Sequence, residues 1–137
     1  MRAMGRWMPL VLAGCAFQQA MHKGEKLAGS GDWEGAYTAY SAAATRNPDA
    51  PEAVAARDGA RDHVVEDELT NAKTALDTGD YEATRVSLDR VAALDPDHPE
   101  VFELTIDMER SMKSRFDYFW EAGDQRTAYD TAIRTRK

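Results

Sequence analysis

The heptapeptide Asn-Pro-Asp-Ala-Pro-Glu-Ala at residues 47–53 returns 48 positions later as Asp-Pro-Asp-His-Pro-Glu-Val at residues 95–101. The same offset relates Gly-Asp-Trp at 31–33 to Gly-Asp-Tyr at 79–81. A weaker third copy, Gly-Asp-Gln at 123–125, follows 44 positions after the second. Two separate motifs that recur at one offset indicate an internal repeat, so the chain is expected to consist of successive copies of one unit.

Each repeated motif has a backbone function. Glycine can adopt the left-handed conformation that ends a helix, and the aspartate after it can accept hydrogen bonds from the free N–H groups of the next helix. Gly-Asp therefore predicts a tight turn between two helices. The prolines at 48 and 96 stop a helix, whereas Pro51 and Pro99 suit the first turn of a new one.

Between these motifs the apolar residues follow helical spacing, and no segment alternates as a strand would. The predicted fold is all-α, with antiparallel helix pairs stacked as a short solenoid. Gly59 lies inside the third predicted helix, so residues 51–78 form either one helix or two. The six expected helices are 17–29, 33–46, 50–78, 81–94, 98–122 and 124–136.

The first copy resembles a tetratricopeptide repeat, and this resemblance covers most of residues 17–137. Small, aromatic and proline positions of that family are matched by Gly24, Ala36, Tyr40, Ala43 and Pro48. The second copy matches at Ala72, Leu88 and Pro96 but has Thr84 and Val91 in place of alanine; the third keeps Ala128 but has Phe116 at a small position. Repeats in that family have about 34 residues, so these copies carry extra residues before each first helix.

The N-terminus resembles a bacterial lipoprotein signal peptide. Arg2 and Arg6 precede an apolar run that ends in Leu-Ala-Gly-Cys at residues 12–15. The run is shorter than the roughly 20 residues of a membrane-spanning helix. We expect residues 1–14 to be a signal peptide and Cys15, the only cysteine, to carry the lipid. The alternative is that this segment is a buried start of the first helix with an incidental cysteine.

On the lipoprotein interpretation, residues 15–137 form one tetratricopeptide-like domain. Ala16 stands where an aspartate commonly retains such proteins in the inner membrane, so the expected location is the periplasmic face of the outer membrane. Loss of Arg2 and Arg6 changes the net charge from −7 to −9. This acidic balance argues against binding of nucleic acid, which requires clustered Lys and Arg.

The sequence contains no pattern that predicts an enzyme, a metal site or a cofactor. The three histidines are distributed over different copies, and no second cysteine is present to complete a zinc site. No phosphate-binding glycine loop or nucleophile elbow is found. We therefore expect a binding protein without cofactors.

The resemblance implies that the first helices of the pairs line a concave binding groove. On that alignment, the groove positions used for the prediction are Leu69, Lys73, Arg110, Lys113 and Trp120. Phe119, Trp120 and Tyr129 also crowd the last copy, which has no polar closing helix to cover its apolar face. We expect this end to be the docking surface.

Two functions are consistent with these features. The first is a lipid-anchored scaffold or adaptor that binds a protein partner in an envelope assembly or secretion machine. The alternative is a structural subunit of an envelope complex that associates with further copies of itself.

Overall fold

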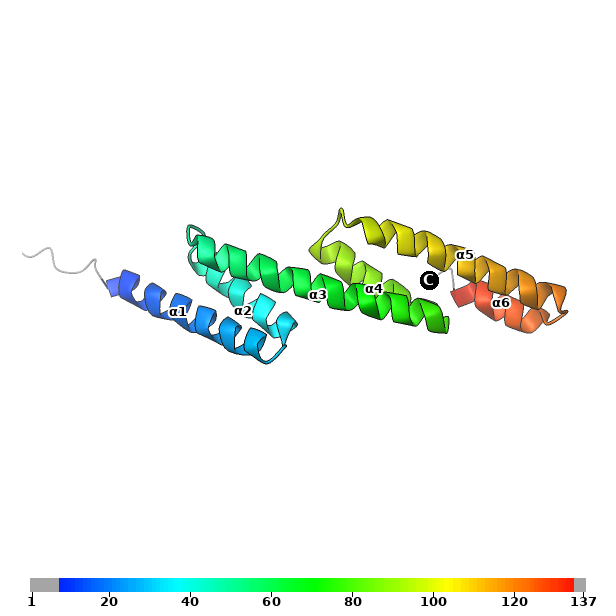
Figure 1. The fold of residues 1–137 in the computed structure, drawn as a ribbon, viewed down its shortest axis with the longest axis horizontal. Coiled ribbons are helices and arrows are strands. Elements are labelled where there is room, and N and C mark those ends of the chain that lie inside the picture. The colour runs from blue at the N-terminus through cyan, green and yellow to red at the C-terminus, as the bar shows by residue number, and fades with distance from the viewer. Residues whose placement is uncertain (1–7, 135–137) are drawn as a thin grey trace, which may run out of the picture. The chain divides into compact units, whose positions relative to one another are not determined.

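A computed structural model describes residues 8–134, and in that part of the chain all regular structure is helical (Figure 1). The fold is all-α, as predicted. The described helices are α1 (Met8–Gly29), α2 (Trp33–Arg46), α3 (Pro51–Thr78), α4 (Tyr81–Leu94), α5 (Pro99–Glu121) and α6 (Gln125–Arg134). The predicted basic start at Arg2 and Arg6 and the last residues of the final predicted helix lie outside the described residues.

The predicted start of the first helix at residue 17 is wrong, because α1 begins at Met8. Pro9 suits a first helical turn, and the Leu-Val-Leu-Ala run at 10–13 has no residue that stops a helix. Helix α1 therefore includes the predicted lipidation site at Cys15. Residues 51–78 form one helix, and Gly59 does not interrupt it.

The three Gly-Asp motifs form the same turn. After α1, the Gly31 N–H donates to the Ala28 carbonyl at 3.0 Å and the Asp32 N–H donates to the Leu27 carbonyl at 2.9 Å. This pattern is a Schellman motif, with glycine at the left-handed position. The corresponding glycines have φ values of 81° at Gly31, 74° at Gly79 and 78° at Gly123.

Aspartate then starts the second helix of each pair. The side chain of Asp32 accepts from the Gly35 N–H at 2.9 Å, and Asp80 and Asp124 accept from the amides three residues onward at 3.1 Å. Five residues after each glycine the side chain is fully buried, at Ala36, Thr84 and Ala128, each with 0% exposure. The repeat found in the sequence is thus a repeat of backbone geometry and of packing.

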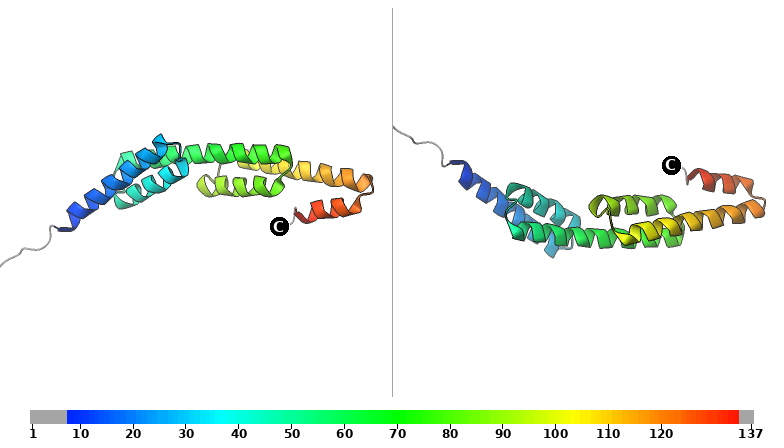
Figure 2. Two further views of the ribbon diagram at one scale, coloured as in Figure 1. Left: turned by 90° about the horizontal axis from the view of Figure 1, so that it is seen from below. Right: turned by 90° about the horizontal axis from the view of Figure 1, so that it is seen from above.

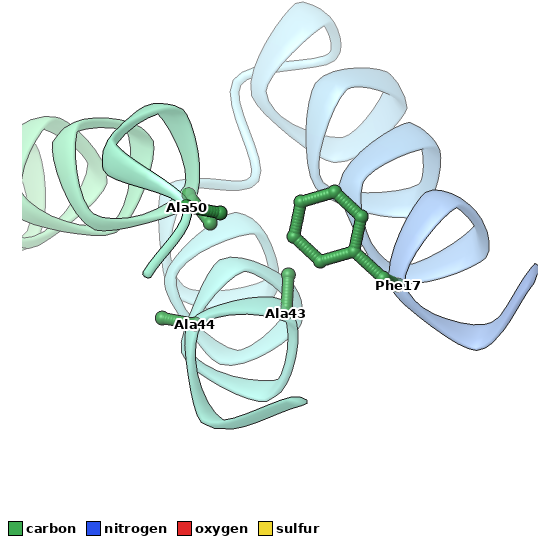
Figure 3. Packing of buried hydrophobic residues seen from close by; sticks show 5 residues of the cluster. Phe17, Ala43, Ala44 and Ala50 are labelled. Atoms are coloured by element: carbon green, nitrogen blue, oxygen red, sulfur yellow. The ribbon is translucent and has the colours of Figure 1, made fainter. Parts of the chain in front are cut away.

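The packing divides the described chain into two compact units, with the boundary between Val64 and Val65 in α3. In the first unit, α1 and α2 lie side by side and antiparallel (Figure 1). Phe17 of α1 shares one buried cluster with Ala43 and Ala44 of α2 and with Ala50, just before α3, and its ring faces Ala43 and Ala50 (Figure 3). Small residues on α2 thus leave room for an aromatic ring from α1.

The second unit contains the rest of α3 together with α4, α5 and α6. Its buried cluster consists of Val65 and Leu69 of α3 and Val91 of α4, with Val101 and Leu104 of α5 packed against it. In this unit α6 folds back antiparallel beside α5 (Figure 2). Helices α3 and α5, which present most of the predicted docking residues, therefore share one core.

Candidate partner-binding surface

Leu69 is not a surface residue, so its prediction as a partner-binding position is wrong. Its exposed fraction is 6%, and it packs against Val65 and Val91. Glu68 beside it is also buried, at 7% exposure, and its carboxylate pairs with Arg90 of α4 at 2.6 Å. This face of α3 is covered by α4, which is why an apolar residue occurs there.

Lys73 lies on the surface and pairs with Glu100 at the start of α5. The hydrogen bond from Lys73 holds the pKa of the Glu100 carboxyl below its ordinary value, and the charge of Lys73 acts in the same direction. About half of the Lys73 side chain is exposed. Within this unit, Lys73 connects α3 to α5 and still faces solvent.

Arg110 and Lys113 extend from the exposed side of α5. Arg110 pairs with Asp107 at 2.7 Å and Lys113 with Asp117 at 2.6 Å, both within the helix. The hydrogen bond to Asp117 raises the pKa of Lys113. Exposed pairs of this kind contribute little to stability, so either cation can exchange its partner for another carboxylate.

Phe119 belongs to a different surface from Trp120. Its ring makes an edge contact with Tyr118 at 5.4 Å between centroids, and the Arg115 guanidinium lies 5.9 Å from it. It lines a hollow formed with the end of α3 and the start of α4, where Tyr81 and Ser111 share a hydrogen bond of 3.0 Å. The structure therefore separates Phe119 from Trp120 and Tyr129, the other aromatic residues predicted to dock a partner.

Trp120 and Tyr129 come together in one groove between α5 and α6. The groove has a volume of about 690 Å³ and is lined by Phe116, Trp120, Gln125, Arg126, Tyr129, Ala132 and Ile133. Trp120 stacks on Phe116 with 5.8 Å between ring centroids. Trp120 is 55% exposed and Tyr129 66%. Large apolar side chains that remain this exposed at one place are typical of an interaction surface.

The groove occurs where the repeat departs from its earlier copies. Gly24 and Tyr40 of the first copy correspond to Phe116 and Ala132 of the third, so the large and small side chains have exchanged helices. Tyr40 is buried against Gly24, whereas Phe116 and Ala132 both line the groove. A ring at the position that is small in the first two copies leaves α6 less room to approach α5.

Two further apolar residues on α5, Phe102 and Ile106, were missed by the sequence analysis. Their exposed fractions are 71% and 37%. A signal was present, because both lie on the same helical face as Trp120. The predicted groove positions on α5 begin at Arg110, so this face was not followed back to Phe102 and Ile106.

Within residues 8–134, no group of three or more His, Cys, Asp or Glu side chains is placed to hold a metal ion. A more polar hollow beside Gly79 is lined by Arg115 and Asp130 among others. At the other end of the chain, Cys15 is an exposed free thiol. Among the described helices, none combines the length and the apolar character needed to cross a bilayer.

No protein-family model, no curated protein and no solved structure matches the chain.

Proposed function

We propose that this chain is a tetratricopeptide-like adaptor that binds a protein partner through the groove between α5 and α6. The observation that carries the proposal is the convergence of Trp120 and Tyr129 on that groove with more than half of each side chain exposed. Aromatic residues of this size supply much of the binding energy at protein interfaces. Arg126 on the groove lining adds a charged group that favours an acidic or polar rim on the partner.

The repeated turns support the tetratricopeptide-like part of the proposal. Each helix pair is closed by the same glycine geometry and the same aspartate cap. Repeats of this kind create extended surfaces that bind partners. The groove lies at the third of these pairs, where Trp120 and Tyr129 remain exposed.

The test compares Trp120→Ala and Tyr129→Ala with the control Tyr118→Ala. Tyr118 is 68% exposed on the same helix but does not line the groove. Partners recovered by the wild-type chain from envelope membranes should be lost with both groove variants and kept with the control. Equal recovery with all three variants would contradict the proposal, provided that circular dichroism shows unchanged helicity.

We also propose that Cys15 anchors the adaptor by a lipid to the periplasmic face of the outer membrane. Support comes from the Leu-Ala-Gly-Cys sequence that ends at Cys15 and from the exposure of the thiol. Each buried methylene of an acyl chain contributes about 0.8 kcal/mol to membrane attachment. Cys15→Ser should abolish incorporation of labelled fatty acid and release the protein from sedimented outer membranes. A wild-type chain that takes up no label would contradict the anchor and leave the groove proposal standing.

A further inference from the structure

A stripe of mostly exposed residues runs along one side of α5 and borders the groove with α6 at Phe116 and Trp120. Its residues are separated by four, three, four, three and four positions. This alternation is the spacing of a coiled-coil seam, in which one helix packs along another. The stripe consists of Phe102, Ile106, Glu109, Lys113, Phe116 and Trp120. At 1.5 Å per residue it is about 27 Å long, which is sufficient for a helix-to-helix interface.

The stripe is complementary to itself when it is read in the opposite direction. Phe102 then faces Trp120, Ile106 faces Phe116 and Glu109 faces Lys113, because each pair is centred on position 111. Two-fold interfaces require this reciprocity. Residue i of one copy contacts residue j of the other, and residue j of the first copy contacts residue i of the second. We infer that α5 pairs with α5 of a second copy in an antiparallel dimer whose two-fold axis lies level with Ser111.

Charge selects the antiparallel arrangement. A parallel pair in register would place Glu109 against Glu109 and Lys113 against Lys113, both repulsive. In the antiparallel pair, each Glu109 meets a Lys113 of the second copy. Glu109 forms no ion pair with any residue in the described range, and Lys113 has only the exposed bond to Asp117. Formation of the new pairs therefore disrupts little within each copy.

The apolar ends of the stripe provide the contact area. Phe102 is 71% exposed and Trp120 55% exposed, and the dimer would bury both rings against each other at its two ends. Ile106 and Phe116 lie between these ends and the central charges. A polar layer between apolar layers fixes the register of such a seam, because any shift would leave Glu109 and Lys113 unpaired among apolar groups.

The inference rests on the proposed function in one respect, namely that the second unit uses its exposed aromatic residues for binding. Phe116 and Trp120 belong to both surfaces. Phe102 belongs only to the stripe, and Tyr129 lines only the groove. These two residues allow the two proposals to be tested separately.

The decisive experiment is a charge-exchange test with full-length chains in mild detergent. Glu109→Lys alone and Lys113→Glu alone each place like charges at both central contacts, so each variant should dimerise at least about tenfold more weakly than wild type. Mixing the two variants restores opposite charges at both contacts, so a tagged Glu109→Lys chain should retain an untagged Lys113→Glu chain. The double variant E109K/K113E should dimerise like wild type in sedimentation equilibrium.

Two controls separate this surface from the groove. Phe102→Ala should weaken the dimer and leave partner recovery intact, whereas Tyr129→Ala should do the reverse. A monomeric wild-type chain would overturn the inference. So would single charge variants that dimerise like wild type, or a mixture that associates no better than either variant alone. Circular dichroism of every variant excludes misfolding as the cause of a lost dimer.

Discussion

Replacement of Gly24 by alanine tests the packing of the first helix pair. Gly24 of α1 is buried under the ring of Tyr40 on α2, which is only 7% exposed. A Cβ placed on Gly24 would lie 2.6 Å from Tyr40 Cδ1 and 2.8 Å from Cζ. Real Cβ atoms do not approach other atoms so closely, so either α1 or the ring must move.

Gly59 is the matched control, because it lies within α3 in the same unit and a Cβ there has no neighbour within 4 Å. Alanine in a helix interior is favoured over glycine by about 0.5–1 kcal/mol, and overpacking of a filled site costs about 1–3 kcal/mol. Both substitutions gain the helical preference for alanine over glycine, but only Gly24→Ala incurs the cost of overpacking. We therefore expect the free energy of unfolding of Gly24→Ala to be about 1–3 kcal/mol below that of Gly59→Ala.

Urea unfolding followed by circular dichroism measures both variants. The second copy suggests a substitution that would compensate for Gly24→Ala, because its positions equivalent to Gly24 and Tyr40 hold Ala72 and Leu88, both buried. The double variant Gly24→Ala/Tyr40→Leu should therefore show a favourable coupling of about 1–2 kcal/mol relative to the sum of its single variants. Equal stability of Gly24→Ala and Gly59→Ala would refute the close approach of α1 to α2.

Two further predictions concern the second unit. Gly79→Val forces a β-branched residue into a site with a φ of 74°, and should lower the free energy of unfolding by about 1–3 kcal/mol; an unchanged melting temperature would show that the turn is misplaced. The lowered pKa of Glu100 means that its bond to Lys73 stabilises the fold above the unfolded pKa, and that this stabilisation is lost as the pH falls through the folded pKa. An NMR titration should give a higher Glu100 pKa in Lys73→Met than in wild type, and identical values would exclude the bond.

The turns of this fold could be predicted from sequence because their chemistry is local. Glycine at the left-handed position and aspartate at the cap are adjacent residues, and all three Gly-Asp motifs form the predicted turn. Thr84 illustrates a tolerated departure. It replaces the expected alanine, is fully buried, and its hydroxyl donates to the Asp80 carbonyl at 2.8 Å, so no polar group is left unpaired.

The candidate surface was predicted less well than the turns, because exposure depends on which neighbour covers each helix face. The alignment placed Leu69 in a groove, but α4 covers that side of α3. Phe119 and Trp120 are adjacent in sequence, yet in a helix adjacent side chains point about 100° apart, and the two line different hollows. Trp120 and Tyr129 were correctly expected at the same end, and their convergence required the observed placement of α6.

Site-specific photo-crosslinking in living cells tests whether the groove between α5 and α6 binds a protein partner. A photoreactive amino acid replaces Tyr129 in the groove or, as the control, Val86 of α4, which is 50% exposed and does not line the groove. A discrete crosslinked adduct with a second protein is expected from position 129 and none from position 86. The absence of an adduct at position 129, or the same adduct from both positions, would contradict binding at this groove.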